Sequence, residues 1–366
     1  MKACSILLSL LAFVPFASAD DLAGHALRFD GVDDITTVPF SPSLDVLAEF
    51  TLEAWVFPAN ANTGGIAGMW GWGGSPDKFL LYLSGGTVVG RISRAGVPFH
   101  DTVSAPIAAG GWTHVALRYD GNDLTLIVNG NEAATTPAPG ALSSVPQDLR
   151  MGIQDIGATD HFFGGQLDEV RLWSIARPTR DIWLDSKTCR TSATSGLVGL
   201  WRFDEALGNQ SIVDSSGNGN DGSLGSSNAI ELEDPVRQSS SAPMNWCDLG
   251  FSLAGSAGEP VLRGVSQMKG GARSYLELRD ARRKSSVALV VGLSQVNAPL
   301  LGGVLVPSTE AIFFGLPTNG NGELILEFAW PAALVFTPAY FQAWIQDPKA
   351  PAGFSASNGL LSDSGF

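Results

Sequence analysis

The stretch Trp112-Thr-His-Val-Ala-Leu-Arg-Tyr119, followed at once by Asp120-Gly121, decides the class of fold. Its odd-numbered positions carry Thr, Val, Leu and Tyr, and its even-numbered positions carry Trp, His, Ala and Arg. In an extended chain these two sets point to opposite sides, and the first set is the more apolar. The alternation therefore predicts a half-buried β-strand, and the Asp-Gly pair predicts a turn into a second strand.

Runs of the same kind lie on both sides of this stretch. Several are closed by Gly-containing pairs that are typical of tight turns, as at residues 26–31, 79–86 and 124–130. Apolar runs separated by Pro and Gly also fill the C-terminal third: 286–292, 302–306, 311–315, 323–330 and 340–346. Only residues 177–184 have a helical pattern, with Pro178 near the first helical position. We therefore expect an all-β protein.

The composition limits the classes of partner. The chain has 366 residues, of which 45% are hydrophobic and 16% charged, and its formal net charge is −14. This length and apolar content support a buried core and about two domains. The low pI, near 4.6, opposes binding to a phosphate backbone, and the basic cluster Arg282-Arg283-Lys284 is too short to reverse this. We expect no nucleic acid partner.

Residues 1–19 have the pattern of a secretory signal peptide. Lys2 precedes an apolar run over residues 6–16, and Ala17-Ser-Ala19 supplies the small residues that precede signal cleavage. We predict cleavage after Ala19 and a secreted or cell-surface protein. No later segment approaches the ~20 apolar residues of a membrane-spanning helix, so we expect no transmembrane segment.

Two cysteines, Cys189 and Cys247, remain once Cys4 leaves with the signal. In an oxidising compartment such a pair indicates a disulfide, here closing a loop of about 58 residues. The alternative is two unpaired thiols. Cysteine and histidine spacing typical of zinc sites is absent, so we expect no zinc.

A short polar stretch without periodicity divides the chain. After the signal peptide we expect one domain over residues 20–235, a linker over 236–246 and a smaller β-sandwich over 247–366.

Four stretches of the first domain carry family motifs in a recognisable order: Ala26–Asp34, Phe50–Val56, Gly111–Gly121 with Val128–Gly130, and Phe163–Trp173. Together they resemble the LamG-like jelly-roll family, whose relatives are laminin G domains, pentraxins and concanavalin A-type lectins and glucanases. The resemblance covers about residues 20–185 and implies an N-terminal concanavalin A-like jelly-roll sandwich. Such folds host many unrelated functions.

The second half resembles a module that recurs at the ends of large exported bacterial proteins. The similar stretches are Asp248–Gly255, Val291–Leu293, Gly302–Pro307 and Tyr340–Asp347. The resemblance implies export and no particular chemistry.

A calcium site is the first candidate site, because many jelly-roll relatives carry one and Ca²⁺ takes about six to eight oxygen ligands from several loops. First and last strands of a sandwich often lie side by side, which would bring the candidate ligands together. The expected ligands are Asp30, the Gly31 carbonyl, Asp34 or its neighbour Asp33, Asp168 and Glu169. The alternative is that Asp30-Gly31 is a turn and that the two later carboxylates accept backbone amides at a strand edge.

Two tryptophans are candidates for ligand binding. Trp70 and Trp72 lie in the glycine-rich stretch Gly68-Met-Trp-Gly-Trp-Gly-Gly74, where open rings would stack on a sugar or an apolar ligand. Packing in the core is the alternative reading.

Catalytic motifs are missing. Glucanases of the concanavalin A-like class need two carboxylates that flank the scissile bond, usually as Glu-x-Asp-x-Glu on one strand face, and this pattern is absent. We therefore expect no catalytic residues and a binding protein for a glycan or another extracellular protein, with calcium as the expected cofactor. Two alternatives stay open: a structural or surface spacer without a specific ligand, and an unusual glycoside hydrolase. The sequence leaves the oligomeric state undecided.

Overall fold

The structure is a computed structural model that describes residues 24–70, 78–155, 160–191, 194–268, 271–334 and 337–363. The expected signal peptide, residues 1–19, lies outside these residues. The described residues form two compact units. The first takes the chain between Ala23 and Ser186 and between Ala193 and Pro243, and the second takes it from Lys187 to Ser192 and from Met244 onward.

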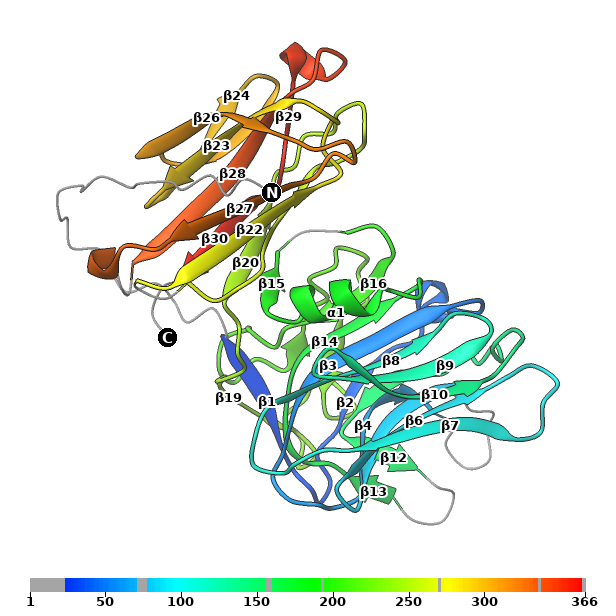
Figure 1. The fold of residues 1–366 in the computed structure, drawn as a ribbon. Helices are drawn as coiled ribbons and strands as arrows, with labels where there is room; N and C mark the ends of the chain where they lie inside the picture. The colour runs from blue at the N-terminus through cyan, green and yellow to red at the C-terminus, as the bar shows by residue number, and fades with distance from the viewer. Residues whose placement is uncertain are drawn as a thin grey trace. The chain divides into compact units, whose positions relative to one another are not determined.

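The first unit contains two large antiparallel sheets (Figure 1). Sheet A has the order β10 (Asn131–Pro137), β9 (Asp123–Val128), β8 (Thr113–Tyr119), β3 (Phe50–Pro58), β14 (Gly164–Trp173), β1 (His25–Asp30) and β19 (Val236–Ser239), with β16 (Leu197–Trp201) also paired to β14. Sheet B has the order β17 (Ser211–Ile212), β18 (Gly222–Leu224), β2 (Thr36–Val38), β11 (Leu149–Met151), β4 (Gly64–Met69), β5 (Phe79–Ser84), β6 (Thr87–Ser93) and β7 (His100–Pro106). A separate hairpin is formed by β12 (Ile153–Asp155) and β13 (Asp160–Phe162).

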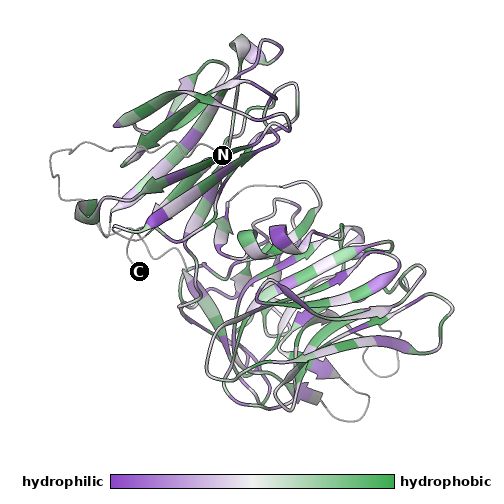
Figure 2. Cartoon of the chain, in the orientation of Figure 1, coloured by the Kyte–Doolittle hydropathy of each residue, from purple (hydrophilic) through white to green (hydrophobic). Residues whose placement is uncertain are grey.

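The core of the first unit lies between these two sheets. Its buried side chains come from both, as with Leu52 and Leu117 from sheet A and Leu81 and Ile92 from sheet B. Figure 2 shows apolar and polar residues alternating along many of the strands, as the sequence predicts. The expectation of a jelly-roll sandwich is confirmed.

One face of strand β8 is more buried than the sequence predicts. Val115, Leu117 and Tyr119 point into the core as expected. The opposite face is buried too, because Ala116 and Ile127 pack against Ile182 of helix α1 (Thr179–Asp185). The helix covers most of the expected segment 177–184 and ends one residue beyond it, at Asp185. It buries the second face of a strand that we expected to be half-buried.

The second unit is a smaller sandwich. Sheet C has the order β15 (Thr188–Arg190), β20 (Trp246–Gly250), β30 (Gly359–Asp363), β28 (Pro338–Gln346), β23 (Ser286–Gly292) and β26 (Ala311–Pro317), with β29 (Phe354–Ala356) also on β28. Sheet D contains β21 (Val261–Gly264), β22 (Arg273–Arg279) and β27 (Leu324–Ala329), and β24 (Gln295–Leu300) pairs with β25 (Gly303–Pro307). Leu276 of sheet D and Phe341 of sheet C share its core. The short 3₁₀ turns of the chain are η1 (Pro42–Leu44), η2 (Ala332–Leu334) and η3 (Pro351–Gly353).

The segment that we expected to be a linker, 236–246, is only partly one. Its first four residues are strand β19, which pairs with β1 at the edge of sheet A, so backbone hydrogen bonding continues past the expected boundary. The chain also leaves the first unit earlier. Strand β15 pairs in parallel with β20, and Cys189 stands opposite Cys247. None of the described helices is long and apolar enough to cross a membrane.

Candidate functional site

Three carboxyl groups gather in the turn that follows β1. One oxygen each from Asp30, Asp33 and Asp34 lies within 4.8 Å of the others. The turn is also held by its own backbone, because the amide of Val32 donates to Asp30 Oδ1 at 2.7 Å and the amide of Asp30 donates to Asp34 Oδ2 at 2.5 Å. The three carboxyl groups therefore belong to the hydrogen-bonded turn itself.

The electrostatics of this cluster favour a cation. Asp34 is 5% exposed. Its burial, together with the charges of Asp30 and Asp33, raises the pKa of Asp34 from 3.8 to about 6, against the effect of the Asp30 amide. A divalent cation among these oxygens would relieve the repulsion, and carboxylates are the ligands that Ca²⁺ prefers. The cluster thus fits the expected metal by charge and by donor type.

Asp168 and Glu169 do not join this cluster. The register of β1 with β14 puts Asp30 opposite Gly164. Asp168 follows four residues later on β14, which at ~3.3 Å per residue is about 13 Å along the strand. The first and last strands of the domain do lie side by side, as expected, but their register separates the proposed ligands.

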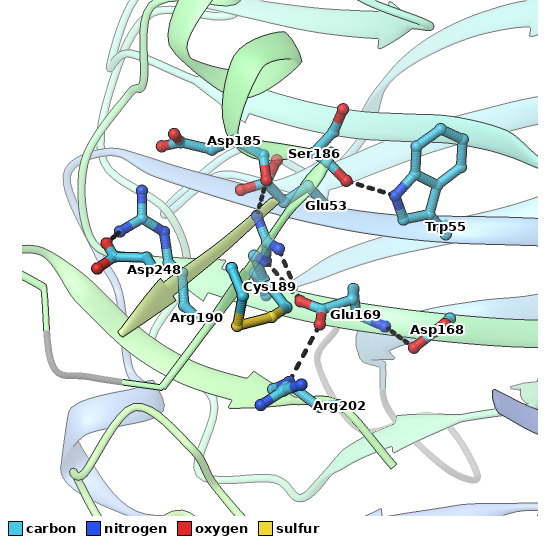
Figure 3. A network of polar contacts seen from close by, with 12 residues as sticks. Glu53, Trp55, Asp168, Glu169, Asp185, Ser186, Cys189, Arg190, Arg202 and Asp248 are labelled. Carbon is cyan, nitrogen blue, oxygen red and sulfur yellow. Dashed lines mark hydrogen bonds and ion pairs between the residues drawn. A yellow bond between two sulfur atoms is a disulfide. The ribbon is translucent and has the colours of Figure 1, made fainter. Parts of the chain in front are cut away.

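Both of these carboxylates have other partners (Figure 3). Asp168 Oδ1 accepts the amide of Glu169 at 2.7 Å, and Asp168 Oδ2 accepts the hydroxyl of Ser240 at 2.5 Å. Glu169 forms ion pairs with Arg171 at 2.6 Å and Arg202 at 3.2 Å. Burial, and then the charge of Glu169, raise the pKa of Asp168 well above its usual value. These groups therefore form a network on β14, an interior strand of sheet A.

A further buried network lies under helix α1, and sequence reasoning missed it. Glu53 on β3 is fully buried; its Oε1 accepts Trp173 Nε1 at 2.6 Å and pairs with Arg177 at 3.0 Å. His114 Nε2 lies 3.4 Å from Glu53 Oε2. Burial opposes ionisation of Glu53, but the neighbouring His114 and the charges of Arg177 and Arg171 lower its pKa to about 2. A Glu in a run of apolar residues was the available signal, but its partners come from strands and loops far apart in the sequence.

Trp70 stands on the outer face of sheet B, away from the core. It packs beside Leu80, Tyr82 and Val89, and remains partly exposed. The guanidinium carbon of Arg91 lies 5.5 Å from the centroid of the Trp70 ring and 5.1 Å from that of Tyr82.

Two more contacts complete this group. Arg91 donates to the Tyr82 hydroxyl at 2.7 Å, and the His100 ring centroid is 5.0 Å from that of Trp70. Trp70 is therefore held by neighbours without being enclosed. Trp72, the second expected ligand-binding tryptophan, lies outside the described residues.

The expected disulfide is confirmed: Cys189 and Cys247 are bonded, at a separation of 58 positions in the sequence. It joins β15 to β20 inside the second unit.

Comparison with known families agrees with the two-sheet sandwich. Residues 30–182 match a laminin G model of the concanavalin A-like lectin/glucanases superfamily. This part of the chain is similar to that superfamily, and we refer to it as the concanavalin A-like domain.

The curated relatives match a short part of this chain. Mouse pappalysin-1 is 33% identical over 81 residues, which are 22% of this chain and 5% of pappalysin-1, so the match spans a small part of that protein. Human pappalysin-1 is 32% identical over the same length and share.

Among solved structures, a putative carbohydrate binding protein from Bacteroides ovatus has 19% identity and a TM-score of 0.47, over 60% of this chain and 61% of its own. The SAP-like pentraxin of Limulus polyphemus has 19% identity and a TM-score of 0.37, over 46% of this chain and 83% of its own.

The concanavalin A-like domain thus offers two different surfaces. One is the carboxyl cluster of Asp30, Asp33 and Asp34 in a turn; the other is the aromatic and basic group around Trp70 and Arg91 on sheet B. The buried acids Glu53, Asp168 and Glu169 belong to neither surface. They are held in ion pairs and hydrogen bonds within the domain.

Proposed function

We propose that the concanavalin A-like domain binds a carbohydrate on the outer face of sheet B and does not transform it. The observation that carries this proposal is the Trp70 ring, which is partly exposed and flanked by Arg91 and His100 at centroid distances of 5.5 and 5.0 Å. An aromatic ring held in a fixed orientation offers a flat apolar surface to the C–H face of a sugar. Neighbouring polar groups then orient the hydroxyl groups of the ligand.

The other side chains on this face support recognition without turnover. Alternation along β5, β6 and β7 places aliphatic, aromatic, basic and hydroxyl side chains on it, from Leu80 and Tyr82 to Thr102 and Ser104. Among the described residues of these three strands, no carboxylate alternates onto the face. A glycosidase needs a carboxyl pair flanking the scissile bond, so the surface is suited to binding.

Calcium has a separate place in the proposal. The carboxylates of Asp30, Asp33 and Asp34 would hold Ca²⁺ and so fix the turn between β1 and β2. Burial, and then the charges of Asp30 and Asp33, raise the pKa of Asp34, and a cation at this place would offset the cost of the ionised group. Asp168 and Glu169 are not part of this proposed site, since both are engaged elsewhere.

The rest of the chain is assigned to export and attachment. The signal pattern of residues 1–19 supports a secreted or cell-surface location. The second sandwich would act as an accessory or attachment module beside the binding domain. A disulfide within it suits an oxidising compartment.

The test is binding of the full mature chain to a panel of immobilised polysaccharides and glycans, in calcium and in EDTA. We expect saturable binding that falls at least about tenfold in Trp70→Ala and is largely kept in Trp70→Phe, because the phenyl ring retains a stacking face. Trp112→Ala is the matched control. Trp112 is also partly exposed, but its Nε1 donates to Ser241 Oγ at 3.0 Å and its ring contacts Phe57, away from sheet B.

Each outcome has a clear meaning. Binding that is equally weakened by Trp70→Ala and Trp112→Ala would reject the sheet B face. Saturable binding to proteins and to no glycan would support the alternative ligand class, and no saturable binding to either would favour a structural spacer. Loss of binding in EDTA alone would assign calcium a direct part in recognition.

A further inference from the structure

Strand β26 ends sheet C with one edge unpaired. In the described chain its only partner strand is β23, and the sheet order stops there (Figure 1). The backbone N–H and C=O groups of Ala311–Pro317 that face away from β23 are therefore available to another strand.

The sequence of β26 lacks the charged side chains that protect many such edges, although the strand ends in Pro317 and its pairing with β23 contains a register shift. It reads Ala-Ile-Phe-Phe-Gly-Leu-Pro and has no charged residue. Several other strands that end a sheet order in the described chain carry a charged residue, such as Glu132 on β10, Asp101 on β7 and Glu327 on β27, whereas the hairpin strands β24 and β25 carry none. Charged side chains on an edge strand hinder pairing with other molecules, and β26 lacks this barrier.

Apolar side chains stand out from this strand. Phe314 is 76% exposed and Ile312 is 40% exposed. Ile312 pairs with Val290, whose side chain belongs to a small apolar cluster on the same face of the sheet. A register shift opposite Val287 and Leu289 then turns Leu316 back toward the core. The exposed pair thus extends an existing apolar face toward the open edge.

We propose that a second copy of this chain pairs with β26, with the two β26 strands antiparallel about a two-fold axis. The distribution of charge around β26 favours a second copy of the chain as its partner. Glu310 is exposed at the start of β26, and Arg282, Arg283 and Lys284 are exposed beside its end, where the amide of Lys284 donates to the Asn319 carbonyl at 3.1 Å. Antiparallel pairing brings the acidic end of each strand to the basic end of the other, twice in one dimer.

The same charges argue against other arrangements. A parallel pair would place like charges together at both ends. At a net charge of −14 two copies repel each other over most of their surface, and the neutral strand with its local basic cluster is a place where this repulsion is relieved. Two-fold pairing also occupies both free edges, so the assembly stops at a dimer.

Sedimentation velocity and light scattering of the full mature chain test this proposal. We expect a dimer at low salt that dissociates as ionic strength rises, and a monomer for Phe314→Lys under the same conditions. Ile325→Lys is the matched control, since Ile325 is 63% exposed on β27 at the edge of sheet D and has no part in the pairing. Unchanged melting temperatures would show that both variants fold.

A charge reversal gives a second, independent readout. Arg283→Glu should raise the dimer dissociation constant at least about tenfold, and adding Glu310→Lys should restore most of the affinity, because the opposite ends again attract. A wild-type chain that stays monomeric at roughly 100 μM, or a dimer equally sensitive to Phe314→Lys and Ile325→Lys, would overturn the proposal. Neither result bears on carbohydrate binding, which uses the first unit.

Discussion

At the scale of single residues, Asp34 belongs to the acidic turn motif and also has a strongly shifted pKa. It lies 5% exposed in the turn after β1, and its pKa is raised from 3.8 to about 6 by burial and by Asp30 and Asp33. A group whose pKa is higher in the folded state binds its proton more tightly there. Protonation of Asp34 therefore contributes its full stabilisation of the folded state below pH 3.8, and this contribution is lost as the pH rises through about 6.

We predict that Asp34→Asn raises the melting temperature above pH 6 without calcium and leaves it nearly unchanged at pH 3.8. The amide removes the ionised carboxylate, and its oxygen still accepts the Asp30 amide. Thermal unfolding followed across this pH range measures the difference between variant and wild type. Asp120→Asn is the control with the opposite sign, because backbone hydrogen bonds from Asp123 and Asn122 lower the pKa of Asp120.

Calcium should stabilise the wild type and not the variant. At pH 7, added Ca²⁺ should raise the melting temperature of the wild type, because only the folded state presents three carboxylates within 4.8 Å of one another. The Asp34→Asn variant should gain little. An equal calcium response in both proteins would remove the proposed metal site, and Asp168→Ala should respond to calcium like the wild type since Asp168 lies outside the cluster.

At the scale of elements, helix α1 and strand β3 depend on charges that the hydrophobic pattern does not reveal. The Glu53 carboxylate accepts a hydrogen bond from Trp173 Nε1 and forms an ion pair with Arg177 through one oxygen, and His114 lies beside its other oxygen. Trp55, two residues on, donates its Nε1 to the Ser186 carbonyl just after the helix at 2.6 Å (Figure 3). The helix is thus attached to the outer face of sheet A by polar as well as apolar contacts.

We predict that Glu53→Gln destabilises the domain by about 3 kcal/mol at pH 7, because the buried guanidinium of Arg177 loses a charged partner. The pKa of Glu53 is lowered from 4.5 to about 2, so the wild-type advantage is present above pH 4.5 and shrinks as the pH falls through about 2. Denaturant unfolding at pH 7 and at lower pH measures both effects.

The control for this prediction is Glu132→Gln. Glu132 pairs with Arg118 but is 48% exposed. Surface pairs contribute about 0–1 kcal/mol, so this variant should lose little stability. Equal losses in the two variants would mean that burial of the Glu53 network does not matter.

At the scale of the whole molecule, the disulfide joins two segments that are separated in the sequence by part of the first unit. Strand β15 comes from a segment between two stretches of the first unit, yet it pairs with β20 of the second. The disulfide between Cys189 and Cys247 holds that pairing, and Arg190 adds an ion pair to Asp248 at 2.9 Å (Figure 3).

We predict that replacing both cysteines with serine lowers the stability of the second unit by about 4 kcal/mol, the chain-entropy value for a loop of this length. Hydrogen exchange should show the loss first at the amides of β15 and β20. Wild-type protein reduced before exchange should behave like the double variant. Unchanged protection of both strands after reduction would contradict a stabilising role for the bond.

Much of this architecture was predictable from local sequence. Alternation of apolar and polar residues indicated strands such as β8, the Pro178 pattern indicated helix α1, and two cysteines after an expected signal peptide indicated their disulfide. These signals are local or arise from composition, so a linear reading captures them. The turn at Asp30 also follows from its Asp-Gly pair, whereas the glycine-rich motif around Trp70 left open whether that ring is exposed or packed.

Only the tertiary structure decided how distant segments meet. The sequence by itself determined that Asp30 and Asp168 lie on strands of one sandwich; the register of β1 with β14 set them apart, because a strand pairing is specified by packing of both faces and not by either strand alone. For the same reason Glu53 is a buried ion-pair partner, β19 extends sheet A and β15 joins the second unit. Each depends on which strand lies next to it, and that information is spread over the whole chain.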